Sequence, residues 1–546
     1  MKAHRLRAPS TDGALLATPP LDEAGSQVDA NVRRLATWDH DFQGRRSSWL
    51  RDLVRLEVAD EARRFLLTNG VEPPETAASG PLVVTGHQPE LFHPGVWVKN
   101  FAASAIAARQ GGVGLNLIVD DDIPKSSSIR VPHAEGGRIS AHRLEFDRWE
   151  GEAPYEDLPV HDEAVFASFG ARVVERLGGL VADPLIEDLW PRVAARREGG
   201  LPLGLRLALA RRDVEASWGV SNLEIPISRL CQTEGFAWFA CHLLAHLPRY
   251  QEVYNDALRE YRAVYGIRSK NHPVSALQQQ GEWLEAPFWV WRAARPRRRP
   301  LLVRQGRTKM DLRIAGEDEP FLQLPLSADR EACCAVERFR ELPEGQIRLR
   351  TRALTTTMFS RCLLGDLFIH GIGGAKYDEL GDAITSRFLG FEPPGFLTLS
   401  MTAWLGLAEH STSPAALAAI DRTIRSLIYN PDRHLSEPWN EDQRSLVQLK
   451  RAVIEREAVA HPQRIARFRE IREINEALQP AVAGRLASLR DDRRRVVQDL
   501  EANRVAHSRE FSFVLYPRER MRALMGGVEQ AIREGSSDAV ELALGS

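Results

Sequence analysis

The stretch from Pro81 to Asp122 constrains the fold of this 546-residue chain more than any other. It begins with an apolar run at 81–84 and continues through a polar loop that contains prolines. Apolar side chains then recur every three or four residues over 96–108, which predicts a helix. A second apolar run at 115–119 ends in three aspartates. This order of segments predicts a βαβ unit with two parallel strands and a right-handed crossover.

Polar residues follow both predicted strands of this unit. Parallel strands place their carboxyl ends at one edge of a sheet, where ligands bind in open α/β folds. We therefore expect one pocket to be shared by two sets of residues that lie far apart in the sequence. They are Gly86, His87 and Gln88 after the first strand, and Asp120, Asp121 and Asp122 after the second.

A second strand, glycine-rich turn and helix occur near residue 370. The run 366–370 reads as a buried strand, residues 371–377 are rich in glycine, and 378–388 is helical in pattern. Backbone N–H groups in such a turn can hold a phosphate or a carboxylate, although a tight turn without a ligand has the same pattern. The candidate ligand-binding residues here are Gly373, Gly374, Lys376 and Tyr377.

The segment from Thr85 to Phe92, followed by Gly95 and a helix that carries Lys99, resembles the opening motif of the cysteine-adding enzymes of bacillithiol biosynthesis. Gly373, Gly374 and Tyr377 also match a glycine-rich segment of that family, whereas Lys376 has no clear counterpart. The resemblance implies a Rossmann-like parallel-sheet core with helical insertions and a C-terminal coiled coil. It also implies a ligase that joins cysteine to glucosaminyl malate and forms a homodimer through its C-terminal helices. The family's acidic motif is replaced here by Asp120-Asp121-Asp122-Ile123-Pro124, so a divergent substrate is an open alternative.

The chemistry of such a ligase suggests roles for the residues at the predicted pocket. His87 and Asp121 are the catalytic candidates, because an imidazole or a carboxylate can keep an attacking amine or thiol unprotonated near neutral pH. Gln88, His93 and Lys99 are candidates for substrate binding, together with Gly86, Asp120 and Asp122. The alternatives are a structural histidine, aspartates that cap the next segment, and a surface lysine. A metal site shared by the histidines and aspartates is a weaker alternative, since no metal-ligand spacing supports it.

Two other functions are compatible with the same pattern. One is a nucleotidyltransferase-like or other ligase that uses ATP or ADP at residues 371–377; the cofactor is otherwise unknown. The other is a non-catalytic assembly protein whose C-terminal helices carry its role.

Composition narrows the partners and the compartment. The 72 Lys and Arg residues nearly balance the 74 Asp and Glu residues, so no overall charge favours nucleic acid or a membrane surface. The five cysteines have no CxxC spacing, which indicates reduced thiols. The N-terminus lacks the apolar core of a signal peptide, and the most apolar window is too short to span a bilayer. We therefore expect a cytoplasmic protein.

The distribution of apolar runs, helical spacing and loop residues along the chain predicts five regions. We expect a helical segment at 1–80, the first part of the core at 81–148, mostly helical insertions at 149–344, the second part of the core at 345–403, and a helical and coiled-coil region at 404–546.

Two local patterns qualify this division. The arginine-rich run at 295–300 reads as a solvated loop that could also meet phosphates. Apolar residues from Ile465 to Leu489 step by three or four, as in a coiled coil, but Pro480 should break or kink the helix.

Overall fold

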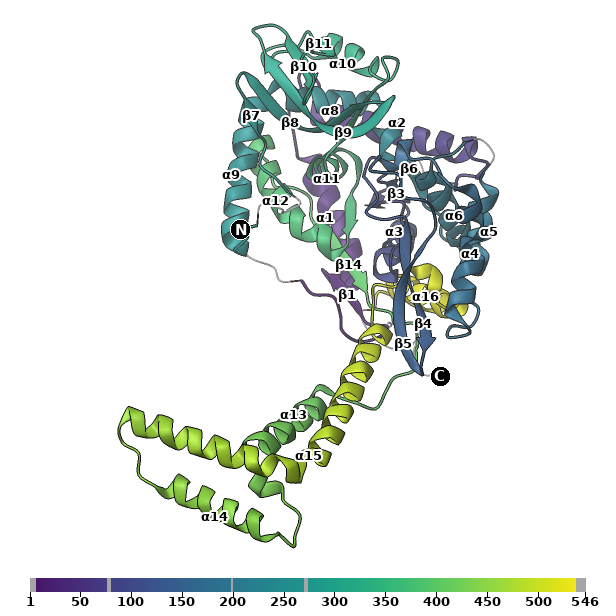
Figure 1. The fold of residues 1–546 in the computed structure, drawn as a ribbon. Coiled ribbons are helices and arrows are strands. Elements are labelled where there is room, and N and C mark those ends of the chain that lie inside the picture. Colours follow the sequence, from purple (N-terminus) through teal and green to yellow (C-terminus); the bar gives the residue numbers. More distant parts are fainter. Residues whose placement is uncertain (1–5, 76–79, 198–199, 270–273, 537–546) are drawn as a thin grey trace. The chain divides into compact units, whose positions relative to one another are not determined.

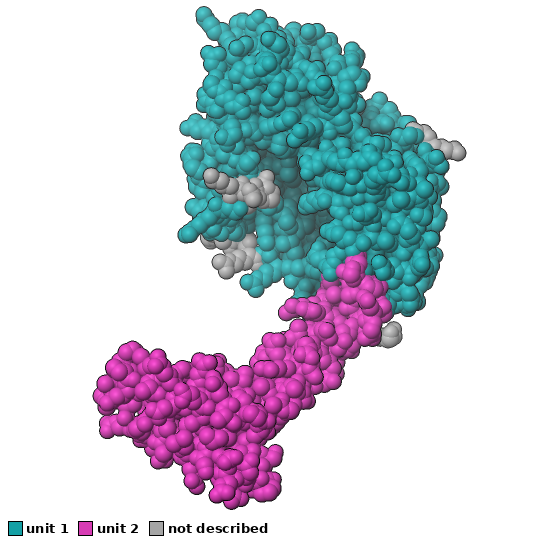
Figure 2. Space-filling model, in the orientation of Figure 1, with its two compact units in different colours: residues 1–131, 143–405, 509–546 teal, residues 132–142, 406–508 magenta. Residues whose placement is uncertain are grey.

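The computed structural model describes residues 6–75, 80–197, 200–269 and 274–536 (Figure 1). The chain divides into two compact units, which Figure 2 shows in different colours. Unit 1 comprises residues 1–131, 143–405 and 509–546, and unit 2 comprises residues 132–142 and 406–508.

A six-stranded, mostly parallel sheet forms the centre of unit 1. In lateral order its strands are β1 (Leu15–Thr18), β14 (Phe396–Met401), β13 (Leu367–His370), β2 (Leu82–His87), β3 (Val113–Ile118) and β6 (Leu223–Pro226). All neighbours are parallel except β1, which runs antiparallel to β14. The chain order progresses outward in opposite directions from β2 and β13, so the connections reverse direction between these two strands.

The prediction that two distant segments of sequence share one sheet is confirmed for β2, β3, β13 and β14. It is wrong for the last part of the first segment and for the first part of the second segment. The hairpin of β4 (Ser128–Glu135) and β5 (Arg138–Glu145) forms its own two-stranded sheet, and β12 (Ile347–Thr351) joins a second large sheet. The central sheet also contains β1, from a segment expected to be helical, and β6, from the insertion. The sequence pattern did not predict these two strands, because the strands that pair with them lie far away in the sequence.

Two helices connect the parallel strands across the region where the site lies. The helix α3 (Pro94–Arg109) leads from β2 to β3, and α12 (Ile372–Leu389) leads from β13 to β14. Most of α3 is buried, because its alanines at 102, 103, 105 and 107 allow the sheet and α16 (Arg518–Glu534) to pack closely against it.

The second large sheet is antiparallel and has the order β11 (Leu322–Leu324), β10 (Met310–Ile314), β9 (Arg295–Gln305), β8 (Trp283–Arg292) and β12, with β7 (Gln279–Gln280) paired to β8. The expectation of a mostly helical insertion is therefore wrong for residues 279–324. The arginine-rich run at 295–300 is the first half of β9 and not a loop. The second half of β9 contains the buried Leu301, Leu302 and Val303 and pairs with β10, whereas Arg295 and Arg299 pair with β8, which extends the strand through the arginines.

Helices make up the rest of unit 1. They are α1 (Ala24–Ala36), α2 (Ser47–Thr68), α4 (Glu163–Leu177), α5 (Ile186–Ala195), α6 (Leu203–Ser217), α7 (Ile227–Leu230), α8 (Glu234–Ala245), α9 (Leu247–Tyr265), α10 (Cys333–Arg340) and α11 (Ala353–Phe359). Short helical turns are η1 (Leu21–Glu23), η2 (Tyr155–Asp157), η3 (Ser360–Leu364) and η5 (Phe513–Leu515). Among the described residues, no helix has both the length and the apolar character needed to cross a membrane.

Unit 2 contains α13 (Pro414–Tyr429), η4 (Pro431–His434), α14 (Glu441–Glu455) and α15 (His461–Ala506). The sequence predicted that Pro480 would break or kink the helix; it does not break it, since α15 continues through this residue. Packing on both sides accounts for this. Leu478 is buried in a cluster with Val447 of α14, and Val482 is buried with Leu427 of α13.

Candidate functional site

A pocket of about 610 Å³ lies at the carboxyl edge of the central sheet. The ends of β2, β13 and β14 and the first turns of α3 and α12 contribute to its wall. Its lining includes Gly86, His87, Lys99, His370, Gly374 and Arg509. It therefore lies where the connections reverse direction between β2 and β13, which is the usual place for a ligand in an open parallel sheet.

His370 and Asp378 form a hydrogen-bonded pair in this pocket. His370 is the last residue of β13, and its Nε2 lies 2.7 Å from Oδ2 of Asp378 on α12. Asp378 Oδ1 accepts a hydrogen bond of 2.8 Å from Thr357, and Arg361 donates to Oδ2. The carboxylate thus holds the imidazole from one side, and the other ring nitrogen, Nδ1, lies beside the first turn of α12.

The surroundings set the protonation of this pair. Burial acts to raise the pKa of Asp378, but the charge of Arg361 and the contact with His370 outweigh it and bring the pKa below its usual range. Burial lowers the pKa of His370, against the opposing effect of Asp378. The pair at neutral pH is therefore a carboxylate and a neutral imidazole. If Nε2 carries the proton toward Asp378, Nδ1 is left as an acceptor on the pocket side.

The first turn of α12 offers backbone donors to the same pocket. The N-cap residue is Gly371, and no side chain of a described residue caps this helix end. The N–H of Ala375 bonds to Gly371, which leaves the N–H groups of Ile372, Gly373 and Gly374 outside the helix ladder. An uncapped helix N-terminus of this kind favours an anionic group.

Lys99 adds a buried positive charge. It is 4% exposed, and its Nζ donates a hydrogen bond of 3.0 Å to the carbonyl of Gly86. Burial lowers its pKa to about 8, so the ammonium remains charged at neutral pH. No carboxylate of a described residue forms an ion pair with it. A buried and uncompensated ammonium is costly unless an anion accompanies it.

Arg509 and Ser400 also line the pocket. Arg509 Nη2 donates 2.9 Å to Oγ of Ser400, and its Nε lies 3.6 Å from a carboxylate oxygen of Glu510. Because Arg509 follows α15 in the sequence, the last part of the chain completes a pocket that begins at β2.

The two histidines predicted from sequence, His87 and His93, line the pocket, but their rings already form hydrogen bonds with other groups of the protein. His87 Nδ1 lies 3.0 Å from the carbonyl of Gln88, and Nε2 lies 3.2 Å from Oδ1 of Asn100. Burial, with Lys99 and Arg211 nearby, puts the pKa of His87 well below its ordinary value. His93 caps α3 by accepting from the N–H of Gly95 at 3.1 Å, and burial lowers its pKa to about 4.

The three aspartates lie beside the pocket, where they bond to neighbouring segments of the chain, and they are not among its lining residues. Asp120 accepts from the N–H of Ser228 at 2.9 Å, and burial raises its pKa to about 7. Asp121 is buried, and burial together with its acidic neighbours raises its pKa well above normal. Asp122 accepts from Gln88 at 2.8 Å and pairs with Arg298 of β9 at 2.8 Å.

The remaining predicted residues divide between the two sides of α12. Gly373, Gly374 and Tyr377 line the pocket together with Gln88, whereas Lys376 is not among its lining residues.

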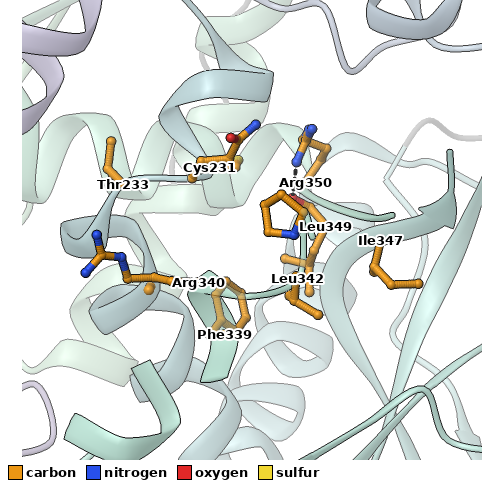
Figure 3. Close-up of a pocket in the computed structure, with 11 residues that line it drawn as sticks. Cys231, Thr233, Phe339, Arg340, Leu342, Ile347, Leu349 and Arg350 are labelled. Atoms are coloured by element: carbon orange, nitrogen blue, oxygen red, sulfur yellow. Dashed lines mark hydrogen bonds between the residues drawn. The ribbon is translucent and has the colours of Figure 1, made fainter. Parts of the chain in front are cut away.

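A second hollow, beside β12, is too small for a substrate (Figure 3). It measures about 10 Å³, which holds at most about one water molecule. Arg350 beside it donates to the carbonyl of Leu349 at 2.9 Å and makes two 2.7 Å bonds to Glu156. The N–H of Glu156 in turn donates to the carbonyl of Asp120. These bonds therefore connect the segment that carries the three aspartates to the second sheet.

Sequence reasoning missed His370, Asp378 and Arg509. A usable signal existed for His370, because it ends an apolar run that was itself identified as a strand. Asp378 had no such signal, since its partners are set by tertiary packing.

Comparison with models of known protein families found no match, and comparison with curated proteins found none either. Within the described residues, no group of three or more His, Cys, Asp and Glu side chains could hold a metal ion.

Proposed function

We propose that this protein is an enzyme that joins an amine- or thiol-bearing small molecule to an anionic partner, as do the cysteine-adding enzymes that its sequence resembles. One observation carries the proposal: a single pocket holds an uncompensated buried ammonium, Lys99, and a carboxylate-backed imidazole, His370. Lys99 would bind an anion, and His370 would act as a base.

The strand order supports a Rossmann-like core for this enzyme. Counted along the chain, the parallel strands are β2, β3, β6, β13 and β14, and their lateral order corresponds to 3-2-1-4-5. That order is typical of doubly wound sheets, whose ligands bind beside the first strand at the reversal. The pocket has this position.

The anionic partner is best accommodated between Lys99 and the first turn of α12. Both offer donors that no described carboxylate satisfies, and a carboxylate or a phosphate would suit either. Gly373 leaves the helix end open, since a Cβ there would have nothing within 4 Å. A sugar-malate acceptor has carboxylates of the required kind.

His370 is the proposed base. The step forms a C–N or C–S bond at a carboxyl carbon of the other substrate and breaks a C–O bond there, with the oxygen leaving as water. The attacking ammonium or thiol must first lose a proton, and Nδ1 of a neutral imidazole can accept that proton and pass it to the leaving oxygen. Asp378 would stabilise the resulting imidazolium through Nε2, as a carboxylate does in other histidine-based catalysts. Asp378 would remain ionised throughout, because Arg361 also compensates it.

A nucleotide-using ligase is the second candidate. The uncapped turn of α12 that fits a carboxylate also fits a phosphate of ATP or ADP, which would supply activation of an acyl group. A non-catalytic assembly protein is the third possibility, and it requires that the pocket bind none of these molecules.

Titration calorimetry of the full chain with cysteine, glucosaminyl malate, ADP and ATP tests the proposal. We expect the wild type to bind an anionic ligand and Lys99→Met to lose most of that affinity. Lys376→Met is the matched control, since it removes a lysine that does not line the pocket. Mass spectrometry of mixed substrates then tests joining, which His370→Gln should abolish. A folded wild type that binds none of the four molecules would favour the assembly protein.

A further inference from the structure

One face of β9 presents a row of arginines. Arg295, Arg297 and Arg299 alternate along the strand and are exposed. The intervening Arg298 belongs to the other face, where it pairs with Asp122 at 2.8 Å. Side chains two residues apart on a strand share a face at intervals of about 7 Å. The register between β8 and β9 shifts between Val290 and Arg292, opposite this row, but all three arginines line one hollow of the second sheet, whose strands β8, β9 and β10 lie together in Figure 1.

The row lines a pocket of about 290 Å³. The lining also contains Arg292 and Trp291 of β8, and the turn at residues 315–317 after β10 forms another part of the wall. None of these residues lines the candidate active site, so the two pockets are separate sites on unit 1.

The charges in this pocket do not balance. Four arginines and one glutamate, Glu317, line it. Glu317 is already engaged by Arg292, whose Nε and Nη2 donate at 3.0 and 2.8 Å. No carboxylate of a described residue lies within ion-pair distance of Arg295, Arg297 or Arg299. The register also sets Arg292 directly opposite Arg295, and like charges facing each other across strands are unfavourable.

The framework beneath the arginines is fixed. Trp291 is 1% exposed, and its Nε1 donates to Oδ2 of Asp157 at 2.8 Å. The backbone of β8 pairs with β9 at Arg295 and Arg299, with a register shift between Val290 and Arg292, and β10 pairs with residues 301–305 of β9. The hollow therefore lies over the β8–β9 pair and the turn that follows β10.

We propose that this pocket is a second binding site, for a small molecule that carries a diphosphate or a comparable multiply charged phosphate group. Guanidinium groups match phosphate oxygens in paired hydrogen bonds, and Arg is the side chain best suited to that geometry. An anion here relieves the repulsion between Arg292 and Arg295 and supplies the charge that the lining lacks. The concave shape favours a compact ligand over an extended polymer. The proposal is independent of the function assigned to the first pocket.

Calorimetry of the full chain with inorganic pyrophosphate, at fixed ionic strength, tests the site. ADP forms a second arm, which distinguishes a nucleotide from a free diphosphate by its tighter binding. The test variant is Arg297→Gln with Arg299→Gln, and the control is Arg307→Gln combined with Arg330→Gln. The control removes the same charge from exposed arginines outside the pocket. His370→Gln and Lys99→Met report on the first pocket.

We expect saturable pyrophosphate binding that weakens at least about tenfold in the test variant, as the loss of two charged hydrogen-bonding groups implies. The control variant and the two first-pocket variants should bind as the wild type does. Equal weakening in the control would show a general surface attraction and overturn the proposal. So would unchanged binding in the test variant, or loss of binding in Lys99→Met, which would place the anion in the first pocket.

Discussion

Nε2 of His370 lies 2.7 Å from Oδ2 of Asp378, at the junction of β13 and α12. A strand end and a helix that begins two residues later thereby fix one imidazole at the edge of the main pocket. The same turn of helix supplies unused backbone donors, so a base and an anion-binding element are built from one short segment.

Replacing His370 by Gln should remove turnover while ligand affinity stays within about threefold. Loss of a general base typically costs about 10²–10⁴-fold in rate. The readout is product formation by mass spectrometry alongside calorimetry on the same sample. Asp378→Asn is a poorer test, because it leaves Arg361 buried without part of its counter-charge, which costs about 3–5 kcal/mol. If His370→Gln kept its shape and its turnover, His370 would not be the base.

Adding a methyl group at Gly374 should disturb the pair, whereas the same change at Gly373 should not. A Cβ at Gly374 would lie 2.8 Å from Nδ1 of His370, while at Gly373 it would meet nothing within 4 Å. Both residues lie in the first turn of α12, so changes in helix propensity are matched. We expect Gly374→Ala alone to lose turnover and ligand affinity. Equal activity of the two variants would show that this side of the imidazole does not face the ligand.

Binding of an anion should weaken as the pH rises through about 8. Burial lowers the pKa of Lys99 to about 8, so the ammonium is charged below that pH and loses its proton above it. Affinity should therefore fall by up to about tenfold per pH unit above 8. Calorimetry between pH 6.5 and pH 9.5 measures this profile. Lys99→Arg, which stays charged, should flatten it, and a profile unchanged by that substitution would remove Lys99 from the site.

Acid should destabilise unit 1 through a histidine cluster. Nε2 of His40 lies 3.1 Å from Nε2 of His242, and His246 lies beside them. Burial is the largest cause that lowers the pKa of all three. The folded state thus favours neutral rings, and the unfolded chain takes up protons first as the pH falls below about 6.5.

The free energy of unfolding should accordingly be highest above pH 6.5 and fall between pH 7 and pH 5. Chemical denaturation at a series of pH values measures it. His242→Gln should be less stable at pH 7.5 yet lose less stability on acidification, because one buried titrating group is gone. A variant with the same acid slope as the wild type would show that other groups control acid unfolding.

Two apolar residues of α15 should respond differently to a charge. Leu486 is buried against α13, whereas Phe468 is 63% exposed. Leu486→Glu should lower the free energy of unfolding by about 3 kcal/mol or more, since it buries a charge. Phe468→Asp should change it by less than about 0.5 kcal/mol.

The same pair of variants tests the proposed homodimer. If α15 contributes to an interface between copies, Phe468→Asp should shift the mass in solution from dimer to monomer without changing the stability of the fold. Light scattering gives the mass. A monomeric wild type would contradict the assembly inferred from the family resemblance.

Local sequence pattern was sufficient for several elements. The βαβ unit at β2, α3 and β3 follows from apolar runs and helical spacing, and it is present within three residues of the predicted bounds. Ser413 caps α13 by accepting a hydrogen bond from the N–H of Ala416, and Pro414 occupies the first turn, in line with the local preferences of serine and proline at helix starts. Such features depend on neighbours in the chain, so a single sequence contains their causes.

Tertiary structure decided the rest. The arginine-rich run became part of β9 because it pairs with β8, and Pro480 stays inside α15 because α13 and α14 pack on either side of it. The aspartates that end β3 bond to Ser228 and Arg298, which removes them from the pocket lining.

The sequence by itself determined that a parallel sheet would carry a glycine-rich helix start at its edge, because strand and helix periodicity are local properties. The choice of functional side chains was made in three dimensions. Lys99, His370 and Arg509 come from distant parts of the chain and meet only where strands reverse their order. Their protonation also depends on burial and on partners such as Arg361 and Asp378, which are properties of the packed state and not of the sequence pattern.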